Sequence, residues 1–263
     1  MTVVADLHVH TTASDGRLSL PEVCRRARQA GLAAIAITDH DRVHPDLGQP
    51  ISTRDGLTII RGLEMKVTRQ NGDHIDLLAY GVETTDGLDA LIEGLQRDRR
   101  KRARRIVARI CDHLEIDLDI EITDGIGRPH IARAVAEHPD TAMSVQDVFD
   151  ELIGNGRPCH VSRDVPDGTD AIPILQEVAP IVAVAHPLRY EDVDGALEVA
   201  ATLGAVERWY PYDHDPDESP VTEAIETHDL VATGGSDAHD GNVGVTGLDY
   251  AAFTPIRRIL EIE

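Results

Sequence analysis

The first residues whose types and spacing could do chemistry are two histidines near the start of the sequence. His8 and His10 follow Val3 to Leu7, an apolar run with the length of a β-strand. Residues i and i+2 of a strand point to the same side, so both imidazoles can reach one metal ion. A single histidine is more often a hydrogen-bonded surface or core residue. The pair alone therefore leaves a metal site and a structural role equally open.

Polar residues able to bind metal recur where other strand-like runs end. Beyond the first pair, the candidate ligands are Asp15, His40, Glu64, His74, His186, Asp237 and His239. His74 differs from the rest because it opens its apolar run instead of following it. Imidazoles and carboxylates without thiolates suit Mn²⁺, Zn²⁺ or Fe, and we expect Mn²⁺ first. The set exceeds the needs of one ion, so it predicts a centre of two or three divalent ions.

The fold must gather the ends of these strands at one place. Apolar runs of strand length alternate with helical patterns, which indicates βα units and a mainly parallel sheet. An S-x-x-E capping box at Ser19 and a stop at Gly31 predict a helix from about Ser19 to Ala30. In a parallel α/β barrel the carboxyl ends of the strands share one face, where the active site is built. The pattern therefore favours an α/β barrel.

A helical stretch interrupts this alternation between residues 86 and 164. It begins with an arginine-dense run, RDRRKRARRIVARI, and strands resume near Ile181. We expect residues 1–85 and 165–263 to form the barrel and residues 86–164 to form a helical insertion that caps it. The arginine run is interpreted first as a solvated helix face paired with acidic residues. A local basic strip that guides an anionic substrate is the alternative.

The composition limits the partners and the compartment. The 263 residues include 47 acidic and 25 basic ones, for a net charge of −22, which repels long nucleic acid and anionic membranes. No window approaches the ~20 apolar residues of a membrane span. The three scattered cysteines indicate a reducing compartment. We therefore expect a cytoplasmic chain. Only Lys66 and Lys101 are lysines. An acidic, lysine-poor surface resembles that of halophile proteins, with an acidic mesophile protein as the alternative.

Six short segments together resemble one known family. In chain order they are DLHVHTTASDG, AITDHD, GLE, GDHIDLLAYG, AHP and GGSDAH. Their order and spacing resemble the polymerase and histidinol phosphatase (PHP) superfamily over nearly the whole chain. The resemblance implies a distorted seven-stranded (β/α)7 barrel, TIM-like, with a helical insertion and a trinuclear metal site.

The resemblance also assigns the candidate ligands to ions. It implies that one ion is held by His8, His10, Glu64 and Asp237, with Glu64 bridging to a second ion at His74 and His186. Asp15, His40 and His239 would hold the third ion. Glu64, Asp237 and His239 are the expected catalytic residues. A hydroxide bridging two ions is the expected nucleophile, since metal binding lowers the pKa of water from about 15.7 towards about 7. Ser236 is expected to be a turn residue instead of a nucleophile.

The insertion carries a second resemblance that concerns the substrate. GRPHIARA and FDELIGNGRP are similar to the insertion of PHP phosphoesterases that act on 3',5'-bisphosphonucleotides and on the 5' ends of short RNA. This similarity makes Arg128, His130 and Arg157 the expected contacts for a substrate phosphate. Cys159 and His160 replace an aromatic-valine pair of that family, and HPLRY and SDAHD replace its HPG and SDFHG. These departures concern the substrate and remove no expected ligand.

The leading hypothesis is therefore an enzyme that hydrolyses a small phosphate ester or a short oligonucleotide. A phosphatase for a small metabolite such as histidinol phosphate is the alternative. A non-catalytic PHP domain should have lost ligands, whereas this set is complete. A C–N hydrolase on a similar barrel would require a carboxylated lysine, and no lysine near mid-chain offers one. The sequence does not determine the oligomeric state.

Overall fold

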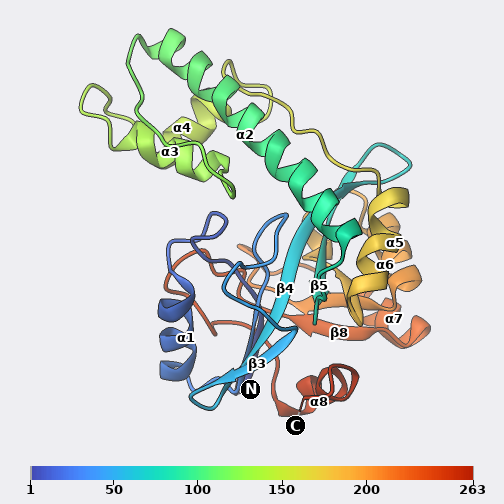
Figure 1. Cartoon of the computed structure of the whole chain (residues 1–263). Helices are drawn as coiled ribbons and strands as arrows, with labels where there is room; N and C mark the ends of the chain where they lie inside the picture. Colours follow the sequence, from blue (N-terminus) through green and yellow to red (C-terminus); the bar gives the residue numbers. More distant parts are fainter. Residues whose placement is uncertain (1, 263) are drawn as a thin grey trace. The chain divides into compact units, whose positions relative to one another are not determined.

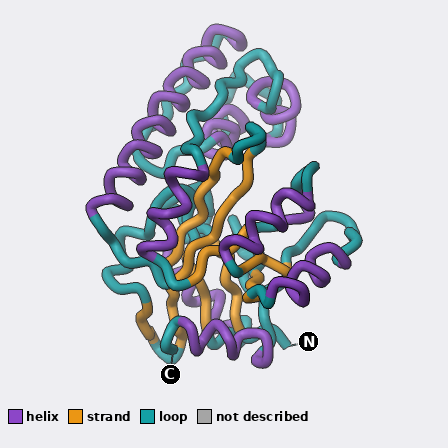
Figure 2. The backbone as a smooth tube through the Cα atoms, turned by 90° about the vertical axis from the view of Figure 1, so that its right-hand side faces the viewer, coloured by secondary structure: helices purple, strands orange, loops and turns teal. Residues whose placement is uncertain are grey.

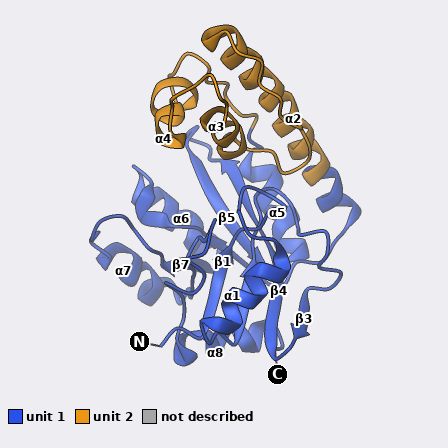
Figure 3. Cartoon of the chain, turned by 90° about the vertical axis from the view of Figure 1, so that its left-hand side faces the viewer, with its two compact units in different colours: residues 1–91, 165–263 blue, residues 92–164 orange. Residues whose placement is uncertain are grey.

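A computed structural model describes residues 2–262 and divides the chain into two compact units. The first unit comprises residues 1–91 and 165–263, and the second comprises residues 92–164 (Figure 3). The described strands all belong to the first unit, and the second contains helices and loops. Residue 86, where the insertion was expected to begin, is the first residue of helix α2 (Asp86–Leu114). The first turn of that helix belongs to the first unit.

A curled sheet forms the centre of the first unit (Figures 1 and 2). Seven strands follow one another in the order β1-β2-β4-β5-β6-β7-β8, and β3 pairs with β4 beside this path. The strands are β1 (Ala5–Val9), β2 (Ala34–Ile37), β3 (Ile51–Arg54), β4 (Leu57–Thr68), β5 (His74–Tyr80), β6 (Ile181–Val184), β7 (Ala205–Trp209) and β8 (Val231–Gly234). The two ends of the path meet through Val9 and Ala238, which form a single parallel bridge. A mixed α/β fold around seven strands is thus confirmed.

One strand departs from the regular parallel barrel that was expected. β5 is antiparallel to both β4 and β6. Residues 69–73 connect β4 to β5, and a parallel crossover needs a dozen or more residues. The short connection therefore forces a hairpin without an intervening helix. Because β5 runs in the opposite direction, its first residues lie at the edge where the parallel strands end.

The helices of the first unit bury apolar faces against the sheet. They are α1 (Leu20–Gln29), α5 (Gly168–Val178), the 3-10 helix η2 (Pro187–Arg189), α6 (Val193–Leu203), α7 (Ser219–His228) and α8 (Tyr250–Ile259). The predicted first helix is confirmed: the backbone N–H of Ser19 donates to the Glu22 carboxylate at 2.9 Å, which closes the capping box. Phe253 and Ile256 of α8 belong to the apolar cluster that includes Ala5 and Leu7 of β1.

The second unit has an apolar core of its own. It contains the remainder of α2, α3 (Arg128–Ala136), α4 (Val145–Val148) and the π-helix η1 (Phe149–Ile153). Ile106 and Ile110 of α2 pack in one cluster with Ile131, Val135 and Leu152. A separate core is the mark of a separate folding subdomain. Within residues 2–262, no helix is both long and apolar enough to cross a membrane.

Candidate metal centre

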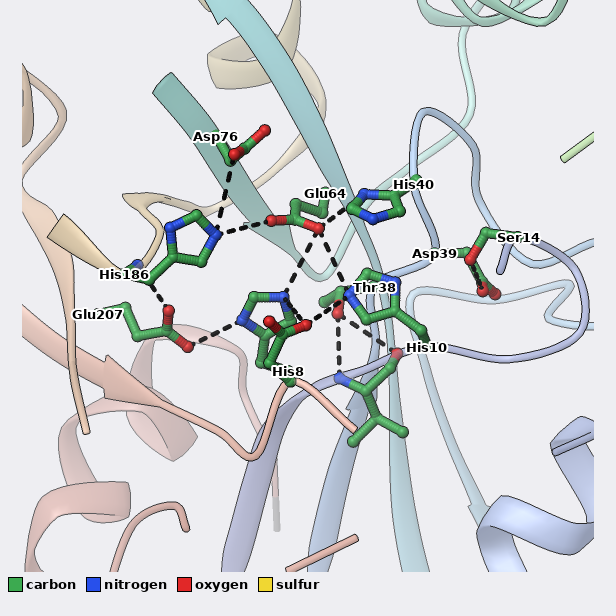
Figure 4. A network of polar contacts seen from close by, with 12 residues as sticks. His8, His10, Ser14, Thr38, Asp39, His40, Glu64, Asp76, His186 and Glu207 are labelled. Atoms are coloured by element: carbon green, nitrogen blue, oxygen red, sulfur yellow. Dashed lines mark hydrogen bonds and ion pairs between the residues drawn. The ribbon is translucent and has the colours of Figure 1, made fainter. Parts of the chain in front are cut away.

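The structure brings all of the predicted ligands except His74 together at one edge of the sheet. Figure 4 shows His8, His10, His40, Glu64 and His186 of this set. All of the gathered ligands except Asp237, together with Asp76, form three overlapping groups in which the possible ligand atoms lie within 4.8 Å of one another. The groups are His8, His10 and Glu64; His10, Asp15, His40 and His239; and Glu64, Asp76 and His186. His10 and Glu64 each belong to two of the groups, and Glu64 contacts histidines of all three.

The group at the end of β1 combines two buried imidazoles with two carboxylates. Glu64 Oε2 lies 3.6 Å from His8 Nε2 and 3.4 Å from His10 Nε2. Asp237 Oδ1 lies 3.4 Å from His8 Nε2 and 3.1 Å from His10 Nε2. Among the described residues, neither Nε2 atom has a hydrogen-bond partner, although both are buried. Buried polar atoms without partners are costly, and their convergence with carboxylates fits a bound divalent cation.

A second group surrounds Asp15 and reaches Glu64. His40 Nδ1 lies 2.7 Å from Glu64 Oε2, and His40 Nε2 lies 3.7 Å from Asp15 Oδ2. His239 Nε2 lies 3.2 Å from the other carboxylate oxygen of Asp15. As in the first group, imidazole nitrogens face carboxylate oxygens. The donor set again suits a divalent transition-metal ion.

The third group contains Asp76 where His74 was expected. His186 Nε2 lies 3.2 Å from Glu64 Oε1 and 3.9 Å from Asp76 Oδ2. His74 pairs with Thr68 at the outer end of the hairpin, is exposed, and has its Nδ1 3.2 Å from Thr68 Oγ1. The two residues share a face of β5, but Asp76 lies two positions closer to Glu64. The structure thus places Asp76, and not His74, in the cluster.

Glu207 is a buried carboxylate that the sequence analysis did not single out. It lies on β7 and is 0% exposed. Its Oε1 is 2.9 Å from His8 Nδ1, and its Oε2 accepts a hydrogen bond from the backbone N–H of His186 at 2.7 Å. This contact leaves His8 Nε2 directed at the cluster and fixes the ring orientation. The available signal was a glutamate within a strand-like segment, AVERW.

The charges at the site depend on its internal contacts. Burial alone would raise the pKa of Glu64, but the facing His40 and His8 hold this pKa well below its usual range. Burial, together with the neighbouring His239 and His40, lowers the pKa of His10. Burial would also lower the pKa of His8, yet Glu207 and the other nearby carboxylates raise it well above its usual value. The histidines and carboxylates of the site therefore shift one another's pKa values strongly, as expected where they lie this close together.

A tyrosine and an arginine border the site beside Asp237. The Tyr210 hydroxyl donates to Asp237 Oδ2 at 2.9 Å, and Arg189 Nη1 donates to the Tyr210 oxygen at 2.9 Å. The Arg189 side chain is 55% exposed, and its Nη1 lies 3.9 Å from Asp237 Oδ2. Tyr210 thus orients one carboxylate oxygen, and Arg189 places an accessible positive charge at the rim.

Two further buried aspartates hold the loops that carry ligands. Asp39 accepts hydrogen bonds from Thr11 N at 2.8 Å and Ser14 Oγ at 2.6 Å, in the loop that leads to Asp15. Asp6 accepts from Ser236 N at 2.9 Å and Ser236 Oγ at 2.5 Å. Ser236 lies in the loop after β8, and its hydroxyl fixes the loop that presents Asp237.

The three predicted phosphate contacts lie in the second unit. Arg128 begins α3, with its guanidinium 5.7 Å from the centre of the Phe149 ring. His130 Nδ1 accepts from Gly127 N at 3.1 Å in the first turn of α3, and Arg157 is exposed in the loop after η1. Helix α3 begins at Arg128, with Pro129 in its first turn. The phosphate-binding roles of all three residues stay predictions.

The arginine run on α2 has two kinds of partner. Arg97 pairs with Glu93 at 3.2 Å, and Arg100 pairs with Asp124, as expected of a solvated helix face. Arg102 instead donates to the Val161 carbonyl at 2.8 Å. Burial, together with the neighbouring Arg128, Arg163 and Arg99, lowers the pKa of Arg102 to about 10. The second unit therefore contains a locally positive cluster within an acidic chain.

A curled α/β sheet that carries imidazoles and carboxylates at one edge defines a metal-dependent hydrolase. Residues 6–152 match the PHP domain family, so the chain belongs to this family. It is a metal-dependent phosphoesterase of the PHP type.

Known proteins share this fold and sequence pattern. The phosphoribosyl 1,2-cyclic phosphate 1,2-diphosphodiesterase of Eggerthella lenta is 27% identical over 248 residues, which cover 90% of this chain and 94% of the relative. The 5'-3' exoribonuclease of Haemophilus influenzae is 31% identical over 200 residues, which cover 72% of this chain and 71% of the relative. A solved structure, described as a putative metal-dependent phosphoesterase from Bifidobacterium adolescentis, has a TM-score of 0.79 at 23% identity and covers 97% of this chain and 96% of its own.

Proposed function

We propose that this phosphoesterase hydrolyses phosphate esters of ribonucleotides, either 3',5'-bisphosphonucleotides or the 5' ends of short RNA. The carrying observation is the convergence of His8 Nε2 and His10 Nε2, both buried and without hydrogen-bond partners among the described residues, on the carboxylates of Glu64 and Asp237. The nucleotide class is supported by the similarity to the Haemophilus influenzae exoribonuclease.

The proposed ligands follow the three groups. His8, His10, Glu64 and Asp237 would hold one ion; Asp15, His40 and His239 a second; and Glu64, Asp76 and His186 a third. We propose Mn²⁺, with Zn²⁺ or Fe as alternatives, because no thiolate is present in these groups. When bound, such ions supply water of lowered pKa and neutralise charge on the phosphate oxygens.

Residues of the chain itself prepare the site for this chemistry. Glu207 holds His8 in one orientation, and Tyr210 holds Asp237. Arg189 offers an exposed guanidinium that suits a phosphate oxygen of the ester. Arg128, His130 and Arg157 are proposed to contact the second phosphate of the substrate. In this proposal the metal ligands determine the reaction, and the arginines determine which ester is accepted.

One observation favours a second candidate substrate. The Eggerthella lenta relative matches along nearly its whole length, whereas the exoribonuclease match leaves more of both chains uncovered. A cyclic phosphate on ribose is therefore the second candidate. Both candidates are phosphate esters of a ribose unit, so the same metal chemistry would serve either.

A substrate panel tests the proposal. Purified protein receives Mn²⁺, Zn²⁺ or Fe²⁺ separately across a range of KCl concentrations, since the charge of −22 supports a proposed high-salt optimum. The panel contains 3',5'-bisphosphoadenosine, short 5'-phosphorylated RNA, phosphoribosyl 1,2-cyclic phosphate and histidinol phosphate.

Release of phosphate or mononucleotide from either of the first two supports the proposal. Turnover of histidinol phosphate alone contradicts it. Asp237→Asn is the inactive control, with its fold checked by circular dichroism.

A further inference from the structure

Lys66 is a rare lysine that lies beside the third group of candidate ligands. The sequence contains only one other lysine, Lys101. Lys66 follows Glu64 by two residues on β4, so both side chains lie on the same face of the strand. In the β4–β5 hairpin it is directly opposite Asp76. The hairpin register thus brings a primary amine to the edge of the site.

The amine binds the carboxylate oxygen that the third group would offer to an ion. Lys66 Nζ lies 2.6 Å from Asp76 Oδ2, with a side chain that is 34% exposed. The same Oδ2 atom lies 3.9 Å from His186 Nε2. The backbone N–H of Asp76 donates to the Tyr190 hydroxyl at 2.8 Å, and this hydrogen bond fixes the backbone of β5 at Asp76. Asp76 Oδ2 is therefore shared between an ammonium group and the proposed ligand set.

In the group at the end of β1, no lysine among the described residues binds a carboxylate of the proposed ligand set. Its carboxylates face imidazoles, which can lose a proton and then act as ligands. The ammonium group of Lys66 offers hydrogen-bond donors and no acceptor, so it competes with an ion for Asp76 Oδ2 and does not bind the ion itself. An ion that takes Asp76 Oδ2 displaces a lysine ammonium from that oxygen. The carboxylate oxygens that face His8 and His10 are paired with imidazoles and not with a lysine.

We propose that Lys66 is an internal cation that competes with metal for Asp76 and makes the group of Glu64, Asp76 and His186 the weakest of the three metal sites. Lys66 thereby sets how many ions the enzyme holds at a given metal concentration. The inference rests on the metal ligands of the proposed function and does not depend on which ester is the substrate.

Titration of Mn²⁺ into the metal-free, full-length protein tests the inference. Calorimetry measures the affinity of each class of site, and the electron paramagnetic resonance signal of free Mn²⁺ counts the bound ions. Lys66→Met keeps the length of the side chain and removes its charge. This variant should bind the weakest ion at least about tenfold more tightly, because no hydrogen bond to an ammonium group must be broken. Lys66→Arg, which keeps the charge, should stay close to the wild type.

Asp76→Asn separates competition from a purely structural role. It should lower the affinity of the weakest site and leave the tighter sites in place, and the double variant with Lys66→Met should show no gain. A merely structural lysine would change the melting temperature of Lys66→Met without changing its Mn²⁺ affinity, and this result would overturn the inference. Unchanged Mn²⁺ binding by Asp76→Asn would overturn it as well, even if Lys66→Met fails to fold. Absence of Mn²⁺ binding by the wild type would overturn the proposed metal centre too.

Discussion

The two units of the chain place their charged residues in opposite ways. In the first unit, buried carboxylates and imidazoles face one another, and the Nε2 atoms of His8 and His10 make no hydrogen bond within the described residues. In the second unit, Arg102 and Arg128 donate to the carbonyl groups of Val161 and Ile153. The first arrangement fits a bound cation. In the second, backbone carbonyl groups accept hydrogen bonds from the two guanidinium groups.

This contrast suggests a division of labour. Loss of a charged group from the first unit should impair metal binding and every reaction that depends on it. Loss of an arginine from the second unit should change which phosphate ester is bound and leave the chemistry intact. The following four variants test that contrast.

Glu64→Gln should have the largest effect, because Glu64 contacts His8, His10, His40 and His186. Neutralising it should lower kcat by about 10³-fold or more, as losses of a main electrostatic contributor do. Steady-state phosphate release measures the effect. Glu226→Gln, an exposed position on α7, is the matched control and should keep wild-type activity. Comparable rates for the two variants would contradict the central role of Glu64.

Glu207→Gln should have the next largest effect. An amide can donate to His8 Nδ1 and thereby stabilise the wrong tautomer of the ring. Loss of such a supporting carboxylate lowers metal affinity or activity by about 10–100-fold. Mn²⁺ titration and kcat should fall together, while circular dichroism stays unchanged. A loss of thermal stability with normal Mn²⁺ affinity would assign Glu207 to packing instead.

Arg128→Met tests the second unit. It removes the charge and keeps an apolar stem against Phe149. The KM for 3',5'-bisphosphoadenosine should rise about tenfold, the usual effect of losing a charged hydrogen bond, with Mn²⁺ affinity unchanged. Arg97→Met is the control, since Arg97 pairs with Glu93 on the solvated face of α2. Reduced Mn²⁺ affinity in Arg128→Met, or an unchanged KM, would break the division between the units.

Tyr210→Phe should have the smallest effect. It deletes the hydroxyl that donates to Asp237 Oδ2 and leaves the ring against His186. Loss of one such hydrogen bond should lower kcat about threefold to tenfold. The kcat of the variant with its preferred metal measures this effect. A decrease as large as that of Glu64→Gln would show that Tyr210 touches the substrate directly.

Much of the site could be predicted because its ligands follow strand-like runs. His8, His40, His186 and Asp237 were singled out because they follow strand-like runs, and the structure places them close together, since parallel strands end at a common edge. The helix after Ser19 was predicted from its capping box and is confirmed. These features depend on short segments, which the sequence specifies directly.

The prediction for His74 was wrong, and Glu207 was not predicted at all. The expectation for His74 assumed that the first residue of its run reaches the site, but the β4–β5 hairpin places it opposite Thr68. Asp76, two residues further, lies next to Lys66 and His186. Glu207 gave no motif, because its meaning depends on His8, which lies far away in the sequence.

The sequence by itself determined the kinds of ligand, their order along the chain and the PHP family, because each is written in short contiguous motifs. Only the tertiary structure decided which carboxylate completes the third group, which one orients His8, and that Lys66 lies against Asp76. Those facts depend on strand direction and register, which arise from pairing between distant segments. The sequence therefore indicates a metal-dependent enzyme, whereas the contacts that orient His8 and that place Lys66 against Asp76 depend on the fold.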